Sequence, residues 1–229
     1  MSDPRSKRFF FVMGLVLIAI VLAGFVPFGL MRPGGIAAVP PLLHFHGAVF
    51  LSWFVLFTVQ ARLVGAGNVQ LHMRLGQLSV LLAVTMIVLA YFVMRHAYAN
   101  PDFSIAGLPA GSSIIFPFTD IVNFTIAYSL AIANRGTAVV HKRWMLLAGI
   151  LMIDPAAARI AIMSGGPPPM ILAIELALFV ALIVYDLRTR RRPSWATMCG
   201  LGLYIAAIAS KFTVAHTPAW ANFVDVVFG

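Results

Sequence analysis

The sequence predicts an all-α, polytopic transmembrane helical bundle with seven spans. Of the 229 residues, 61% are apolar and only 10% are charged, whereas about 25% of the residues of an average soluble domain are charged. Apolar stretches of about 20 residues, the length that crosses the hydrocarbon core of a bilayer, recur along the chain. We therefore expect a single transmembrane domain over residues 1–229, with the lipid bilayer as its first partner.

Short segments rich in Gly, Pro, Asn and Ser separate the apolar stretches, as expected for loops between spans. The first stretch follows a basic start and exceeds about 20 residues, which is longer than the apolar part of a secretory signal, so we expect it to be retained as a helix. The predicted spans are residues 9–31, 42–65, 72–95, 113–133, 142–163, 169–187 and 195–215.

A weak internal repeat relates two parts of the chain. The pattern G-x-x-x-x-H-x-R occurs at residues 67–74 and again at 136–143, each time closing an inner loop and opening an outward-running span. This pattern favours a duplication in which the second and third spans correspond to the fourth and fifth. The alternative is that loops at the membrane surface reuse Gly and basic residues.

The net charge of +9 is explained by membrane topology, so no nucleic-acid partner is expected. If the N-terminus is cytoplasmic, the outer loops hold only Arg32 and Arg95. Because positively charged loops stay in the cytoplasm, this predicts a multi-pass protein of the bacterial inner membrane, with its N-terminus inside and its C-terminus outside. Twelve of the sixteen Lys and Arg residues then lie at the inner side: Arg5, Lys7, Arg8, Arg62, Arg74, Arg135, Lys142, Arg143, Arg188, Arg190, Arg191 and Arg192.

Ionisable groups inside a bilayer are costly, so each is a candidate for function. A rise of about 1.5 Å per residue places most of these groups in the outer half of their spans. We therefore expect a polar cavity that opens outward, although carboxylates and cations at this depth would also form purely structural ion pairs. The candidate cavity residues are His44, His46, Trp53, Gln60, Asp120, Asn123, Asp154, Arg159, Glu175, Lys211 and His216.

Three of these residues are candidate metal ligands. His44, His46 and Asp120 would give zinc, iron or copper three ligands and leave a fourth position open, the arrangement of catalytic sites. Residues i and i+2 of a helix point to nearly opposite faces, so both histidines bind only if Pro40 and Pro41 make the first turn irregular. The alternative is that these histidines anchor the span at the lipid interface. His46 also begins a seven-residue stripe with Trp53 and Gln60, which faces the interior.

A second candidate site lies at the inner side, where His72 and His141 each begin an outward-running span. Two such histidines are able to ligate a b-type haem, with Arg74, Lys142 and Arg143 near its propionates. The single cysteine, Cys199, belongs to no c-type haem attachment motif and to no internal disulfide. The alternative is that these basic residues contact lipid headgroups.

Several motifs together resemble a functionally uncharacterised family of bacterial multi-pass membrane proteins. They are LLHFHG at 42–47, LHMRLG at 71–76, FTDIVNF at 118–124, and HKRWMLLA at 141–148 followed by PAAAR at 155–159. Members of this family read H-x-H-G, L-H-R-R-L-G, G-D and H-K-R-x-M-L-L-A…P-A-x-x-R. The resemblance covers residues 9–160 and departs from the pattern at Met73 and Thr119. It implies no activity and marks as pattern positions His44, His46, Gln60, His72, Asp120, His141 and Arg159.

The leading functional hypothesis is a protein that binds a metal or haem near a His/Asp cavity and performs redox chemistry. A second is a carrier or sensor for a small solute, such as an anion, with Arg159 and Lys211 as counter-charges. A third is a metal-dependent intramembrane hydrolase in which the catalytic groups Asp120 or Glu175 move protons. A fourth is a structural or assembly subunit, so the sequence leaves open whether the protein is an enzyme.

Overall fold

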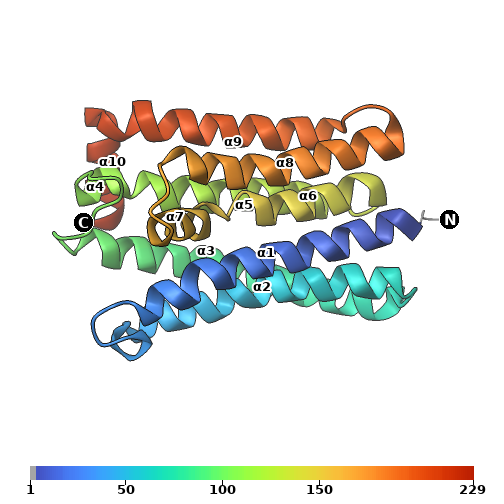
Figure 1. The fold of residues 1–229 in the computed structure, drawn as a ribbon, viewed down its shortest axis with the longest axis horizontal. Coiled ribbons are helices and arrows are strands. Elements are labelled where there is room, and N and C mark those ends of the chain that lie inside the picture. Colours follow the sequence, from blue (N-terminus) through green and yellow to red (C-terminus); the bar gives the residue numbers. More distant parts are fainter. Residues whose placement is uncertain (1–3) are drawn as a thin grey trace.

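The computed structural model of the protein describes residues 4–229, with side chains from Arg8 onward. Arg5 and Lys7, two of the basic residues counted above, lie outside the described side chains. Long helices run side by side along one axis, as Figure 1 shows. The described residues contain no β-strand beyond one isolated bridge between Ile105 and Leu108, so the predicted all-α class is confirmed.

Six helices are long and apolar enough to cross a membrane. A window of each has high mean hydropathy and few charged residues, and one face of each helix packs into the shared core. The fourth of them begins with the short helix α4 (Ala110–Ser113), which leads into α5. The six are α1 (Pro4–Leu30), α2 (Pro41–Gly65), α3 (Val69–Tyr98), α4 with α5 (Ile115–Ala133), α8 (Pro169–Arg190) and α9 (Trp195–Thr213).

The predicted span 142–163 is not one continuous helix. It forms α6 (Ala138–Ile150) and α7 (Asp154–Met163), whose axes differ by 41°, and the chain has seven spans only if this bent pair is counted as one. The physical reason is Pro155, which lacks a backbone N–H and disfavours helical geometry in the residue before it. The backbone tightens before the break, where the N–H of Ile153 donates to the carbonyl of Ile150 at 3.2 Å.

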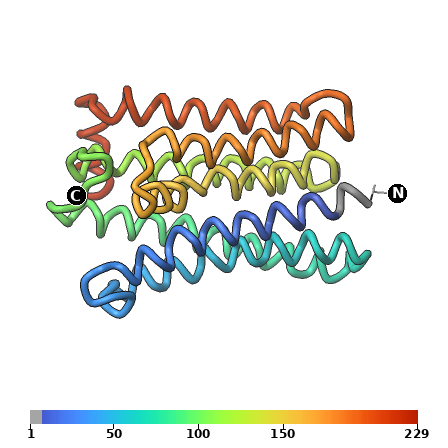
Figure 2. The backbone as a smooth tube through the Cα atoms, in the orientation of Figure 1, coloured from blue at the N-terminus to red at the C-terminus, as the bar shows by residue number. Residues whose placement is uncertain are grey.

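The helices alternate in direction, and the two ends of the chain lie at opposite ends of the bundle (Figure 2). The loops between α2 and α3, α5 and α6, and α8 and α9 lie at the end of the N-terminus. Most of the Arg and Lys residues of the chain lie in these loops or in the helix ends beside them. The opposite end holds the C-terminus and the short 3-10 helices η1 (Ile36–Ala38) and η2 (Val214–His216). We call the end with these three loops the basic end, and the end with the C-terminus the C-terminal end.

A last helix, α10 (Pro218–Phe228), was not predicted. Its buried residues Trp220, Val224 and Phe228 recur at four-residue spacing, whereas Val226 is 85% exposed. The indole N–H of Trp220 donates to the carbonyl of Gly111 at 3.0 Å, which ties α10 to α4. The helix escaped prediction because its 11 residues are too few to cross a bilayer.

The break brings α7 very close to α1. A Cβ atom at Gly24 would lie 2.6 Å from the carbonyl oxygen of Ala156, and one at Gly200 would lie 2.6 Å from a methyl group of Leu147. Small residues at such crossings let helix backbones approach closely, as is common in membrane bundles. The position of α7, and therefore of the charged residues on it, depends on this contact with α1.

Candidate functional site

A buried lysine joins three helices toward the C-terminal end of the bundle. Lys211, in the last turn of α9, is 5% exposed. Its Nζ forms an ion pair with Asp154 Oδ2 at the start of α7, and lies 3.5 Å from Asp120 Oδ1 on α5. The same ammonium lies 5.1 Å from the ring centroid of Phe116, one turn before Asp120. Three of the predicted cavity residues, Asp120, Asp154 and Lys211, therefore meet.

Glu175 on α8 adds a third carboxylate. It is 3% exposed, and its Oε2 accepts a hydrogen bond of 2.7 Å from the hydroxyl of Tyr204 on α9. Glu175 lies close enough to interact electrostatically with Asp120, Asp154 and Lys211. We call Asp120, Asp154, Glu175, Tyr204 and Lys211 the acidic cluster.

The acidic cluster contains three carboxyl groups and one ammonium group. Lys211 and Tyr204 donate to one oxygen of each carboxyl group, but Asp120 Oδ2 is buried and has no hydrogen-bond partner among the described residues. A buried polar atom without a partner is costly, and a buried charge without a counter-charge is costlier. The cluster thus carries more negative than positive groups and one oxygen that remains free for a ligand.

The backbone explains why these side chains meet. Asp154 is the first residue of α7, directly after the 41° break that follows α6, and from there its carboxylate pairs with Lys211. Asn123, one turn after Asp120, donates to the carbonyl of Leu203 at 3.4 Å and so links α5 to α9. Beside this link, a hollow of about 180 Å³ lies between α5 and α9, one turn from both Asp120 and Lys211. It is lined by Phe118, Thr119, Val122, Asn123, Leu203, Ala206, Ala207 and Ser210.

The predicted ligands His44 and His46 do not join Asp120. His44 is exposed, and the ring of His46 packs 4.0 Å from that of Phe50. In the described part of the chain, no three His, Cys, Asp or Glu side chains are placed together to hold a metal ion. His216 is exposed in η2, outside the acidic cluster. The metal site at these residues stays a prediction.

Arg159 also stands apart from the acidic cluster, although it shares α7 with Asp154. Its guanidinium carbon lies 4.3 Å from the ring centroid of Phe25 and 5.1 Å from that of Phe28, both on α1. Its Nη1 donates to the carbonyl of Pro155 at 2.7 Å. His46 interacts with it electrostatically. Among residues 4–229 it has no carboxylate within ion-pair distance.

The predicted stripe of α2 is buried, and its contacts hold helices together. Trp53 is 1% exposed and packs edge-on against Phe124 of α5 at 5.3 Å between ring centroids. Gln60 donates from Nε2 to the carbonyl of His72 at 3.1 Å. These contacts connect α2 to α5 and α3.

His72 and His141, the two candidate haem ligands, both lie at the basic end. Their imidazoles are close enough to interact electrostatically. His141 Nδ1 lies 2.8 Å from the carbonyl oxygen of Ala131, and His72 Nδ1 is buried without a partner among the described residues. Arg74, which was expected near a propionate, is exposed.

Two further propionate partners were expected. Lys142 donates from Nζ to the hydroxyl of Tyr185 at 3.3 Å, and Arg143 is engaged elsewhere. Its Nε and Nη2 lie 2.7 and 2.5 Å from Asp186 Oδ1. Asp186 Oδ2 accepts hydrogen bonds from the backbone N–H of Ser194 at 2.8 Å and from the Thr197 hydroxyl at 2.6 Å. Both charged groups are fully buried. This complete ion pair holds α6, α8 and α9 together at the basic end.

Sequence reasoning missed two residues of these networks, Asp186 and Tyr204. Asp186 is the only acidic residue beside the basic run at 188–192, and a lone carboxylate in such a run indicates an internal ion pair. Tyr204 gave no comparable signal, because its contact with Glu175 joins positions 29 residues apart on two helices.

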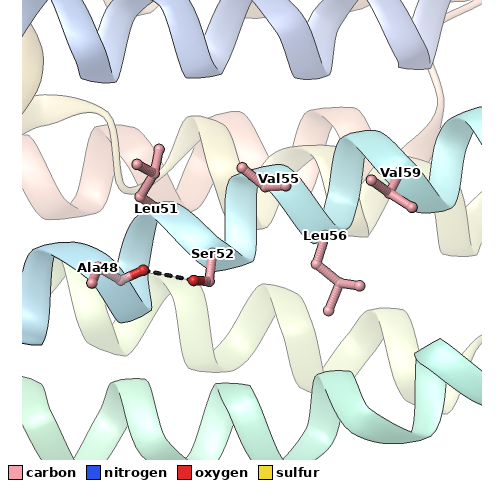
Figure 3. A pocket seen from close by; sticks show the side chains of 6 residues that line it. All are labelled: Ala48, Leu51, Ser52, Val55, Leu56 and Val59. Carbon is pink, nitrogen blue, oxygen red and sulfur yellow. Dashed lines mark hydrogen bonds between the residues drawn. The ribbon is translucent and has the colours of Figure 1, made fainter.

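A second hollow lies elsewhere and has a different character. It measures about 470 Å³, and Figure 3 shows that all six residues lining it belong to α2. Ser52, the one polar side chain among them, donates to the carbonyl of Ala48 at 2.7 Å. Because one helix supplies the whole lining and no ionisable group is present, this apolar groove is not the candidate site. Its lining is Ala48, Leu51, Ser52, Val55, Leu56 and Val59.

Comparisons with family models, curated proteins and solved structures gave no match. The family resemblance of the quoted motifs therefore stays a prediction. The function is therefore inferred from the geometry of the acidic cluster and of the groups around it.

If the ion pairs of Lys211 stabilise the bundle, Lys211→Met will lower its melting temperature in detergent. Removing one partner of a buried pair destabilises by about 3–5 kcal/mol, since the other charge stays buried. The double variant Lys211→Met, Asp154→Asn should recover part of the loss, and Arg135→Met, at an exposed position, should melt like the wild type. A double variant less stable than the single one would contradict this account.

Proposed function

We propose that the protein is a membrane carrier that binds a proton or a small monovalent cation at the acidic cluster. One observation carries the proposal: three carboxyl groups, two of them buried and that of Asp154 16% exposed, lie around a single ammonium group, and Asp120 Oδ2 has no partner among the described residues. With three carboxylates and one ammonium, the acidic cluster has two more negative than positive groups, and because uncompensated charge is costly inside a membrane, it attracts further positive charge. A proton or a small cation supplies it without enlarging the site.

The break between α6 and α7 supports a binding role for this position. Interrupted helices place their ends near the middle of the membrane, and carriers use those ends to bind ions. The C-terminal end of α6, at Ile150, carries partial negative charge, which adds to the attraction for a cation. Irregular backbone is tolerated at this depth where it is covered by protein or lines a cavity.

Lys211 acts as an internal cation in this mechanism. In the absence of a ligand its ammonium stays between Asp154 and Asp120. A proton or cation that binds to the carboxylates weakens these ion pairs, so that Lys211 is released from one of them. Binding and release of the ligand thereby change the contacts among α5, α7 and α9, the coupling that a carrier needs.

The charge of the acidic cluster also favours a cation carrier over an anion carrier or a metal-dependent hydrolase. Lys211, expected as a counter-charge for an anionic solute, already faces carboxylates and does not attract an anion. The hydrolase hypothesis needs a metal ion to activate water, and its residues Asp120 and Glu175 fit a cation-binding role equally well. In a cation carrier, every charged group of the acidic cluster has a role in binding or release of the cation.

We further propose that the basic end of the bundle faces the cytoplasm of a bacterium, in its inner membrane. Positive loops remain inside, and nine arginines and lysines of α2, α3, α6, α8 and the loops between helices lie at the basic end: Arg62, Arg74, Arg135, Lys142, Arg143, Arg188, Arg190, Arg191 and Arg192. The acidic cluster then lies toward the outer face, where an external cation enters it.

Transport by purified protein in liposomes tests the carrier proposal. A pH-sensitive dye inside the vesicles reports proton movement, while imposed sodium or potassium gradients reveal cation exchange. We expect flux with the wild type, and at least about a tenfold loss with Asp120→Asn, which removes a charge worth more than 1.4 kcal/mol of binding. Asp102→Asn, in an exposed loop, should transport like the wild type. Absence of flux in the wild type, or equal flux in Asp120→Asn, would refute the proposal.

A second candidate function, haem binding, is favoured by the pair His72 and His141. A hydrogen bond from His141 Nδ1 to the Ala131 carbonyl would leave Nε2 free to ligate iron, the usual arrangement of a ligating histidine. His72 supplies a second imidazole nearby.

The absorption spectrum of the purified protein after incubation with haemin tests this second candidate. Bis-histidine ligation predicts a Soret band that His141→Ala removes and that His96→Ala, at the opposite end of α3, leaves unchanged. A wild type that binds no haemin, or a spectrum identical in the His141→Ala variant, would exclude haem at this pair.

A further inference from the structure

A second group of charged side chains, separate from the acidic cluster, lies between α1, α2 and α7. Arg159 interacts electrostatically with both His46 and Arg32, so a second guanidinium group and an imidazole lie within electrostatic range of it at the C-terminal end of the bundle. No carboxylate lies within ion-pair distance of Arg159 in the described part of the chain. The group therefore has the opposite charge imbalance to the acidic cluster.

The guanidinium of Arg159 is held in a fixed orientation. Phe25 and Phe28 pack against it, with ring centroids 4.3 and 5.1 Å from its Cζ. Nη1 donates to the carbonyl of Pro155 at 2.7 Å. A guanidinium has five N–H donors in a planar fork, so this one backbone contact leaves donors for a ligand. Stacked and oriented guanidinium groups are suited to bidentate recognition of oxyanions.

His46 adds a second polar group to the same place. Its Nδ1 is buried and has no hydrogen-bond partner among the described residues. Its ring packs against Phe50 at 4.0 Å, which fixes its orientation. A buried polar atom without a partner is rare in proteins and calls for a ligand or another explanation.

We infer that Arg159, His46 and Arg32 form a binding site for a phosphate-type oxyanion. A phosphate oxygen pair matches the planar fork of Arg159, and an N–H of His46 provides a third donor. The negative charge relieves the repulsion between Arg159 and Arg32. The site is distinct from the proposed cation site, and its test does not require transport. The same chemistry is offered by free phosphate and by a phospholipid headgroup.

Two measurements on the full-length protein distinguish these sources. Delipidated protein in detergent is titrated calorimetrically with inorganic phosphate, with sodium chloride at equal ionic strength as the reference. In parallel, native mass spectrometry counts phosphatidylglycerol molecules that remain bound when this lipid is added. Binding of phosphate identifies a site open to a free anion, whereas binding of the lipid alone identifies a headgroup site.

Variants test the residues. We expect Arg159→Gln to weaken binding of the bound oxyanion at least tenfold, and Arg159→Lys to weaken it as well, because a point charge cannot replace the fork. Arg32→Gln, at an exposed position, should weaken binding without disturbing the fold. It therefore tests the site even if Arg159→Gln does not fold. Arg95→Gln, an exposed arginine near the same end, is the matched control and should bind like the wild type. If the wild type binds neither phosphate nor phosphatidylglycerol, or if Arg32→Gln and Arg159→Gln bind both as the wild type does, the inference is overturned.

Discussion

The ion pairs of Lys211 are the interaction on which the C-terminal half of the bundle depends. An ammonium buried at this depth is stable only beside negative charge, and Asp154 and Asp120 supply that charge from two other helices. For Asp154 to reach Lys211, the fifth predicted span has to break before Pro155. The bend of 41°, the close contact of α7 with Gly24 on α1, and the position of Lys211 are therefore parts of one arrangement.

The ion pair of Arg143 with Asp186 and the acidic cluster differ in how fully their polar groups are satisfied, and this difference indicates a structural role for the first and a binding role for the second. Between Arg143 and Asp186, each carboxylate oxygen has a donor, and the contacts join helices without leaving a free group. Such a pair needs no ligand. In the acidic cluster the carboxyl groups outnumber the ammonium, and Asp120 Oδ2 lacks a partner. The incomplete network is the one that has a reason to bind something.

Hydropathy and charge patterning predicted the helical class and six of the spans within a few residues, since the length and polarity of a span are local properties. Depth along each helix also placed Asp120, Asp154, Glu175 and Lys211 at one level. The sequence could not show that His46 and Arg159 lie apart from them, because that depends on which helices are neighbours. Sequence analysis also missed Asp186, because its ion pair with Arg143 depends on which helices are neighbours. It missed α10 because 11 residues are too few for a membrane span.

Infrared absorption of the carboxyl groups in purified protein tests the central claim most directly. In buffer free of small metal cations, the carboxyl groups of the acidic cluster that exceed its ammonium have to carry protons. The account predicts a band of protonated carboxyl groups at neutral pH that is weaker in Asp120→Asn and unchanged in Asp102→Asn. It also predicts that the band weakens when a cation that binds the cluster is added. A wild-type spectrum without this band, unchanged by Asp120→Asn, would contradict the account.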